Sequence, residues 1–208
     1  MKYSIDLEKL SVQEYKELLK RQNLLPGRRI LWQDMDQNFT KIENDNIKTV
    51  EQLRKTLSTP IKFAAFASST GISEDYLLIL KRELSCFEQK PIPLTDFLGI
   101  DPALIEQLNK IGIGNSKEYY ESGLSTSDEL FCLSDLVRVN GIGAIAARAF
   151  YEAGYRSVTD IAAASAEEML SRISVVNETH HYYKAKLGVK DMQFCIDFAV
   201  LLMNYCSR

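Results

Sequence analysis

The chain has 208 residues, a hydrophobic fraction of 46% and a formal net charge of −3. This length allows one large domain or two small ones, with enough apolar residues for a buried core. The acidic balance excludes a protein held to nucleic acid mainly by a basic surface, and no apolar run is long enough to span a bilayer. Because the opening MKYSIDLEKLS carries charges where a secretion signal would be apolar, we expect a cytoplasmic protein without membrane contact.

The charges are distributed unevenly along the chain. Residues 1–60 carry 11 Lys and Arg against 9 Asp and Glu, whereas residues 61–208 carry 14 against 19. Any contact with nucleic acid must therefore be local. The densest basic run, which we expect to be a solvated helix face, consists of Lys16, Lys20, Arg21, Arg28 and Arg29.

Helix signals dominate, and sustained alternation of polar with β-branched residues is absent, so we predict an all-α protein. Capping residues or an N-terminal proline open the predicted helices at Ser11, Pro60, Ser73, Asp101-Pro102 and Ser165. The stretch around Gly71 and Ser73 also resembles a helix-turn-helix. Its second helix begins with Glu74 and Asp75, which phosphates would repel, so a glycine C-cap followed by a serine N-cap is the better interpretation.

Few residues offer catalytic or metal-binding chemistry. The four cysteines form no CxxC pair, and the only two histidines, His180 and His181, are adjacent, so they cannot easily chelate one ion from a helix. We therefore expect no enzyme activity, metal, cofactor or small-molecule substrate. Trp32 either anchors the N-terminal region or contacts a partner, and we expect it to be buried. The apolar last helix, DMQFCIDFAVLLMNY, either packs on the bundle or forms an oligomer interface, and we expect packing.

The second half contains an internal repeat with a shift of 42 residues. This shift aligns FLGIDPALIEQLNKIGIGNSKE (97–118) with VNGIGAIAARAFYEAGYRSVTD (139–160), so that Gly112 falls on Gly154. A degenerate copy, 66 residues earlier, places Asn46 at the same position. After each of these residues comes a capping pair, Thr49 with Gln52, Asn115 with Glu118, and Ser157 with Asp160. Three copies of one pattern predict stacked supersecondary units that share a core.

The most distinctive stretch is Asn140-Gly141-Ile142-Gly143, here called the GIG turn, between a helix predicted to end at Val139 and one predicted to begin at Ala144. Its spacing is that of a helix-hairpin-helix motif. Glycine permits positive φ and leaves the rim of the turn without side chains, while Ile142 points inward. Bare amides at a helix N-terminus favour an anion such as phosphate.

These residues resemble those of tandem helix-hairpin-helix proteins, which hold DNA through turn amides and a nearby basic residue. The stretches 70–80 and 133–173 are most similar to a mainly bacterial family, the DUF4332 domain, whose function is unknown. The resemblance implies a SAM-like helical bundle. It assigns nucleic-acid contact to Arg138, Asn140, Gly141, Ile142, Gly143 and Arg148. In the preceding copy Asp101 replaces the second glycine, so we expect Asp101 to cap its own helix.

We predict an N-terminal helical extension (1–35) followed by a tandem helix-hairpin-helix domain (36–208). Within that domain we expect a degenerate repeat (36–90), a degenerate hairpin (91–130), an intact hairpin (131–175) and C-terminal helices (176–208). The leading function is a non-enzymatic module that binds the nucleic-acid backbone weakly and without sequence specificity, DNA in preference to RNA. The alternative is a protein-interaction scaffold that keeps the hairpins for structure alone.

Overall fold

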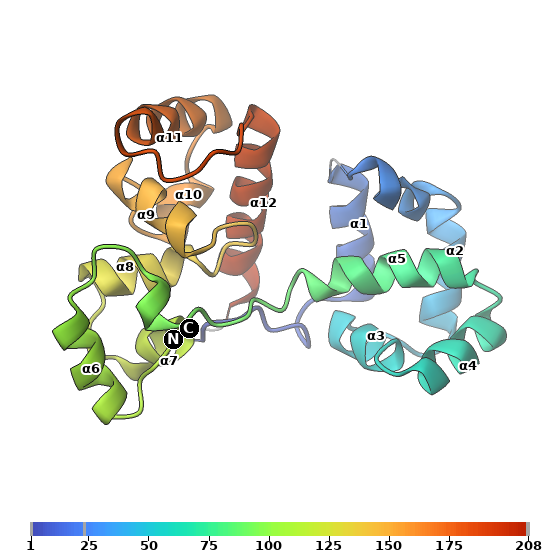
Figure 1. Ribbon diagram of the computed structural model, residues 1–208. Coiled ribbons are helices and arrows are strands. Elements are labelled where there is room, and N and C mark those ends of the chain that lie inside the picture. Colours follow the sequence, from blue (N-terminus) through green and yellow to red (C-terminus); the bar gives the residue numbers. More distant parts are fainter. Residues whose placement is uncertain (1, 23, 207–208) are drawn as a thin grey trace. The chain divides into compact units, whose positions relative to one another are not determined.

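The computed structural model describes residues 2–22 and 24–206, which form twelve α-helices and two 3₁₀-helices (Figure 1). No β-strand occurs among these described residues, and extended pairing is limited to two isolated bridges, Ser11 with Thr49 and Pro93 with Asn115. The predicted all-α class is confirmed. The contacts divide the chain into two units: an amino-terminal unit, Asp6–Glu88, and a carboxy-terminal unit made of Gln89–Arg208 with Met1–Ile5.

This division differs from the predicted boundary at residue 35, because the first helix is part of the amino-terminal unit. The Val12 amide donates to the Lys48 carbonyl and the Val50 amide donates to the Leu10 carbonyl, each at 2.9 Å. Residues 2–5 belong to the other unit instead, where the Tyr3 hydroxyl lies 2.8 Å from Ser116 Oγ. Partners this distant in sequence leave no local signal, so the sequence suggested a separate extension.

The amino-terminal unit is a small helical bundle around Tyr15, Phe39, Leu53 and Leu80, all buried. Ser11 caps the first helix through a capping box with Glu14, and Gly71 ends the fourth helix in the left-handed conformation, as predicted. Its elements are α1 (Val12–Arg21), η1 (Pro26–Trp32), α2 (Met35–Asn44), α3 (Val50–Thr56), α4 (Pro60–Thr70) and α5 (Glu74–Ser85).

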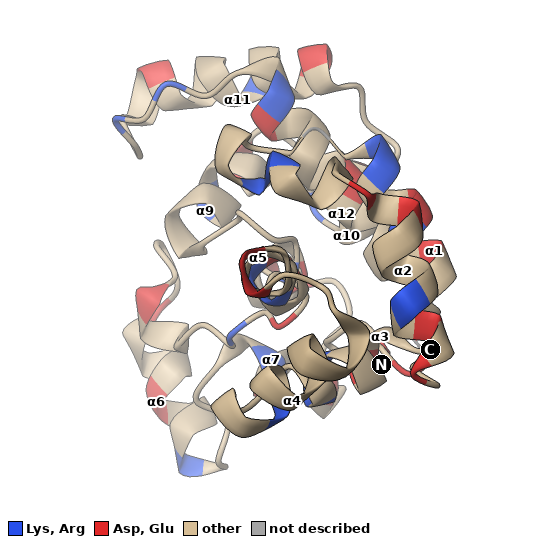
Figure 2. Ribbon diagram, turned by 90° about the vertical axis from the view of Figure 1, so that its right-hand side faces the viewer, with Lys and Arg blue, Asp and Glu red and all other residues tan. Residues whose placement is uncertain are grey.

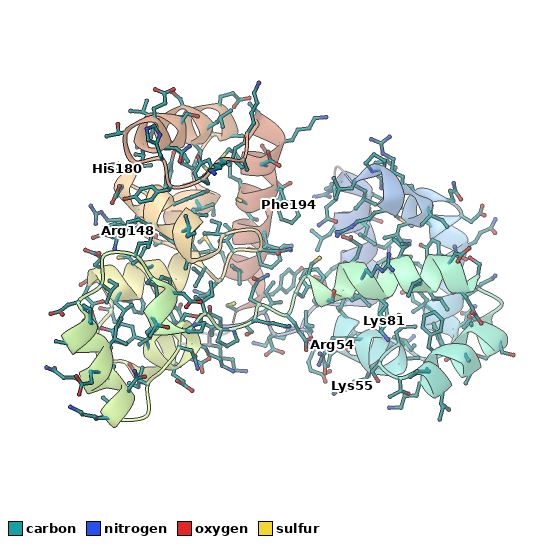
Figure 3. All side chains as sticks on the ribbon, viewed as in Figure 1. Arg54, Lys55, Lys81, Arg148, His180 and Phe194 are labelled. Atoms are coloured by element: carbon teal, nitrogen blue, oxygen red, sulfur yellow. The ribbon has the colours of Figure 1, made fainter. Side chains whose placement is uncertain are left out.

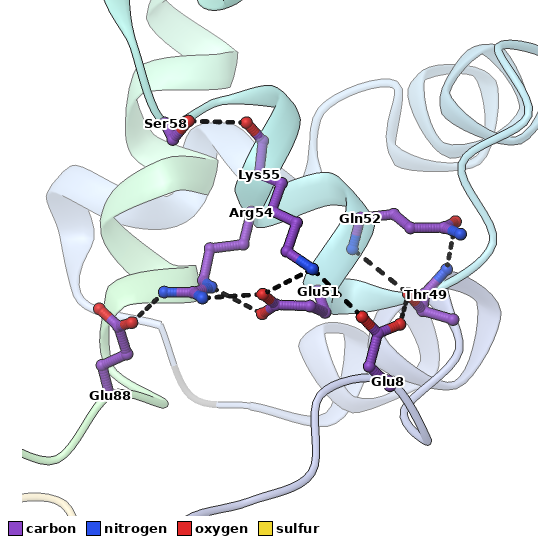
Figure 4. Close-up of polar contacts among 8 residues, drawn as sticks. All are labelled: Glu8, Thr49, Glu51, Gln52, Arg54, Lys55, Ser58 and Glu88. Carbon is purple, nitrogen blue, oxygen red and sulfur yellow. Dashed lines mark hydrogen bonds and ion pairs between the residues drawn. The ribbon is translucent and has the colours of Figure 1, made fainter.

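Charged side chains tie α3 to the segment before α1 and to the end of α5 (Figure 4). Lys55 Nζ lies 3.3 Å from carboxylate oxygens of both Glu8 and Glu51, and Arg54 pairs with Glu51 and Glu88. Exposed ion pairs contribute about 0–1 kcal/mol each. Their main effect here is to neutralise the cations of α3, which therefore present no free basic surface.

The carboxy-terminal unit holds both predicted hairpins, and α12 packs within it as expected. This last helix packs against α10 and α11, burying Met192, Cys195, Ala199 and Leu202. Its burial raises the pKa of the Cys195 thiol to about 12, so that thiol is unreactive. The elements are η2 (Leu94–Asp96), α6 (Pro102–Lys110), α7 (Ser116–Ser122), α8 (Glu129–Leu136), α9 (Ala144–Glu152), α10 (Val158–Ala162), α11 (Ala166–His180) and α12 (Val189–Tyr205).

The three predicted repeat positions share one backbone conformation. Asn46, Gly112 and Gly154 have φ angles of 61°, 84° and 95°. In each copy the next helix is capped by a side chain, from Thr49, Asn115 and Ser157 respectively. The repeat inferred from the sequence is therefore a structural repeat, and it spans both units.

Asn46 tests this equivalence, because it holds a left-handed conformation that glycine adopts without strain. We expect Asn46→Gly to raise the free energy of unfolding of the amino-terminal unit by about 0.5 kcal/mol, and Asn46→Ala to lower it by about 1 kcal/mol. Urea unfolding followed through Trp32, the only tryptophan, measures both.

The matched control is Asp45→Gly at the adjacent position, where φ is −81° and glycine relieves no strain. This control should lower stability slightly. Stabilisation by Asp45→Gly equal to that by Asn46→Gly would contradict the proposed equivalence of the three positions.

Candidate nucleic-acid interface

The GIG turn joins α8 to α9 through a tight bend. α8 ends at Leu136 rather than at the predicted Val139, because the Arg138 and Val139 amides bond three residues back and tighten the last turn. The Ile142 amide then donates to the Val139 carbonyl at 3.0 Å, with Gly141 at φ 95°. A positive φ at the third residue is the requirement of a type II turn, which explains the need for glycine there.

The two sides of this turn have opposite environments. Ile142 is 4% exposed and Ala147 is fully buried, so the hairpin closes on its inner side as predicted. Gly143 is exposed, and a Cβ placed on it would meet no atom within 4 Å. No side chain of the described residues caps α9 at Gly143. The first amides of α9 therefore face open space at the positive end of the helix dipole.

Arg138 does not supply a cation to this surface, and that prediction is wrong. Its side chain is buried, with Nε donating to the Tyr3 carbonyl at 2.8 Å and Nη1 donating to the Tyr120 hydroxyl at 2.6 Å. It also pairs with Asp135, whose second oxygen accepts from the Val158 amide at 2.8 Å. Burial acts to lower the pKa of Arg138, but Asp135 and its other neighbours raise it overall, so the guanidinium stays charged inside the unit.

Arg148 is likewise buried, which corrects its predicted role (Figure 3). Its Nε donates to the Leu98 carbonyl at 2.9 Å, and Nη2 pairs with Glu129. A Cβ added to Gly99 would lie 2.7 Å from Arg148 Nη2. Arg148 therefore packs on the turn of the other hairpin, the position equivalent to Gly141, and closes it.

In the degenerate hairpin Asp101 also occupies the start of the helix after the turn. Its carboxylate accepts from the Ala103 amide at 2.9 Å and caps α6, as the sequence predicted. The two hairpins thus differ in chemistry at the same structural position. The helix start at Gly143 is open to an anion, whereas the one at Asp101 already holds a carboxylate.

One residue of α12, Phe194, lies at the open turn and escaped the sequence analysis. A Cβ at Gly141 would lie 3.7 Å from Cε1 of Phe194, whose side chain is 41% exposed (Figure 3). Lys190 is exposed one helical turn before Phe194, on the same face of α12. Asn140, at the second position of the turn, is half-buried. The surface beside the turn therefore includes the ring of Phe194, and no local spacing could have placed it there.

The contact between Gly99 and Arg148 can be measured through stability. We expect Gly99→Ala to lower the free energy of unfolding by about 2–3 kcal/mol, because it combines a strained φ of 79° with displacement of a buried guanidinium. Gly123→Ala is the matched control, with φ 73° and no atom near the added Cβ, and should cost only about 1 kcal/mol. Urea unfolding followed by circular dichroism at 222 nm compares them, and equal costs would show that Arg148 does not constrain Gly99.

Comparison with known proteins bears on the same segment. Residues 133–178 match a family described as SAM-like helix-hairpin-helix tandem. No curated protein and no solved structure matches the chain. The matched span includes the GIG turn and runs from α8 into α11. Geometry and match agree in supporting a helix-hairpin-helix protein.

Proposed function

We propose that the GIG turn binds backbone phosphates of nucleic acid, DNA in preference to RNA, weakly and without reading sequence. The observation that carries this proposal is the uncapped start of α9 at the exposed Gly143. Backbone amides there point away from the helix, and the helix dipole favours a negative charge. Phosphate is the anion that a glycine rim admits most closely, since no side chain stands in its way.

The contact is small, which is why the binding is weak. Only one of the two hairpin turns is open, and both arginines assigned to it are buried. In Figure 2 the ribbon positions of Lys and Arg alternate with those of Asp and Glu along the helices. One or two phosphate contacts give a slope of log K against log salt of about −1 to −2, much smaller than that of proteins with many contacts.

The competing function is a protein-interaction scaffold, and one observation favours it. Both arginines assigned to phosphate contact are buried in structural hydrogen bonds, Arg138 with Tyr3 and Arg148 with Leu98. Under this alternative the hairpins only build the bundle. Lack of enzyme activity, a cytoplasmic location and the resemblance to the DUF4332 family stay predictions from the sequence. No helix in the described ranges is long and apolar enough to cross a membrane.

A single substitution separates the two functions. Gly143→Asp places a carboxylate at the start of α9, as Asp101 does at α6, and should reduce binding to a labelled generic oligonucleotide at least tenfold. It should not damage the fold, because aspartate is a good N-cap and the site has room for it; we expect stability to rise by a few tenths of a kcal/mol. Fluorescence anisotropy at about 20 mM salt measures the affinity.

Gly27→Asp is the charge-matched control, since Gly27 also has open space around an added Cβ and no positive φ. It should leave the affinity within twofold. No binding by the unaltered protein at high micromolar concentration, or equal affinities for the two variants, would leave the scaffold as the function.

A further inference from the structure

An open pocket of about 680 Å³ lies in the amino-terminal unit, and none of its lining residues belongs to the span matched by the family comparison. It is formed where the end of α1, the end of η1 and the start of α2 meet. Its lining residues are Lys20, Trp32, Asp34, Met35, Asp36 and Gln37. Nothing in the proposed function uses this pocket.

Trp32 presents a fixed aromatic surface to the pocket. Its side chain is 40% exposed, which corrects the expectation of burial, and its Nε1 donates to the Leu19 carbonyl at 3.0 Å. The polar end of the indole is therefore satisfied, and what remains accessible is ring surface. An exposed ring held in one orientation is typical of recognition sites, where it contributes contact area at low entropic cost.

Asp34 supplies a negative charge beside this ring. It has φ 48° and ψ 28°, a left-handed conformation that glycine, asparagine and aspartate adopt more readily than other residues. Its side chain does not cap α2, and within the described part of the chain its carboxylate has no ion pair. Glycine would fit this backbone better, so its conformation alone does not account for an aspartate here.

The other charges of the pocket are already neutralised. Asp36 Oδ1 lies 3.1 Å from Lys16 Nζ and 3.0 Å from Lys20 Nζ, and these hydrogen bonds lower the pKa of Asp36. Arg29 places its guanidinium carbon 6.0 Å from the centre of the Trp32 ring, at the outer limit of a cation–π contact. Asp34 is therefore the acidic lining residue left for a ligand.

We propose that this pocket receives an arginine side chain from a segment of a partner protein. The planar guanidinium stacks on Trp32 and donates to the Asp34 carboxylate, while its aliphatic stem lies over Met35. Arginine fits better than lysine because its flat fork can do both at once. A phosphate in place of the guanidinium would be repelled by the Asp34 carboxylate. The inference does not depend on the proposed function, since it concerns another unit and other residues.

Because Trp32 is the only tryptophan, its fluorescence reports directly on the pocket. The full chain is titrated with the blocked pentapeptide Gly-Arg-Gly-Arg-Gly and with the same peptide carrying citrulline, which keeps the shape but removes the charge. We expect a saturable change with the arginine peptide and at least fivefold weaker binding of the citrulline peptide. Equal responses to both peptides would overturn the proposal.

Variants at Asp34 separate charge from backbone strain. Asp34→Asn keeps a residue that tolerates the left-handed conformation and should weaken arginine-peptide binding at least tenfold. Asp34→Gly should weaken it equally while raising Tm by about 2–4 °C through release of strain. Asp45→Asn, at the far end of α2, is the control for loss of one exposed carboxylate and should change nothing.

Two further results would contradict the proposal: unchanged affinity in Asp34→Asn, or tighter binding of a generic single-stranded oligonucleotide than of the peptide at Trp32. Gly143→Asp keeps the pocket intact and should bind the arginine peptide as the unaltered chain does. Failure of nucleic-acid binding at the GIG turn is thus distinguishable from failure here.

Discussion

The carboxy-terminal unit depends on one buried ion pair, between Asp135 and Arg138 near the end of α8. Through it the start of the chain, α7 and the start of α10 are bonded to one helix end, since the pair reaches the Tyr3 carbonyl, the Tyr120 hydroxyl and the Val158 amide. Removing one partner of such a pair typically costs about 3–5 kcal/mol, because the other charge stays buried. The pair lies directly before the GIG turn, where the Arg138 and Val139 amides end α8.

Arg148 shows how the two hairpins have diverged. In the degenerate hairpin the turn glycine, Gly99, is covered by this guanidinium, and Asp101 fills the helix start. In the intact hairpin the equivalent Gly141 has only the ring of Phe194 nearby, and Gly143 is open. The same fold therefore serves packing in one copy and leaves an uncapped helix start in the other. A cation from the open hairpin closes its neighbour, so the openness of one and the closure of the other are linked.

What the sequence predicted correctly was local. Helix caps such as Ser11 and Asp101, and the positive φ at Gly112 and Gly154, depend on residues within a few positions, so their spacing carries the information. The burial of the two arginines could not be predicted from local spacing, because Arg148 bonds to a carbonyl 50 residues away and Arg138 to one 135 residues away. For the same reason the structure differs from the predicted boundary at residue 35 and from the predicted burial of Trp32, and the position of Phe194 was not predicted. Each is decided by packing between distant segments.

The two exposed features have opposite electrostatic preferences. Uncapped amides at Gly143 favour an anion, whereas Asp34 beside Trp32 favours a cation. Because each feature is built from residues of its own unit, the two ligands use different residues. The acidic net charge of the chain does not oppose binding of the cationic ligand. A protein with both would bring a nucleic-acid backbone and an arginine-bearing partner to one chain. Binding through a single open hairpin can then be weak, because the arginine contact at Trp32 adds to the total binding free energy when both ligands belong to one assembly.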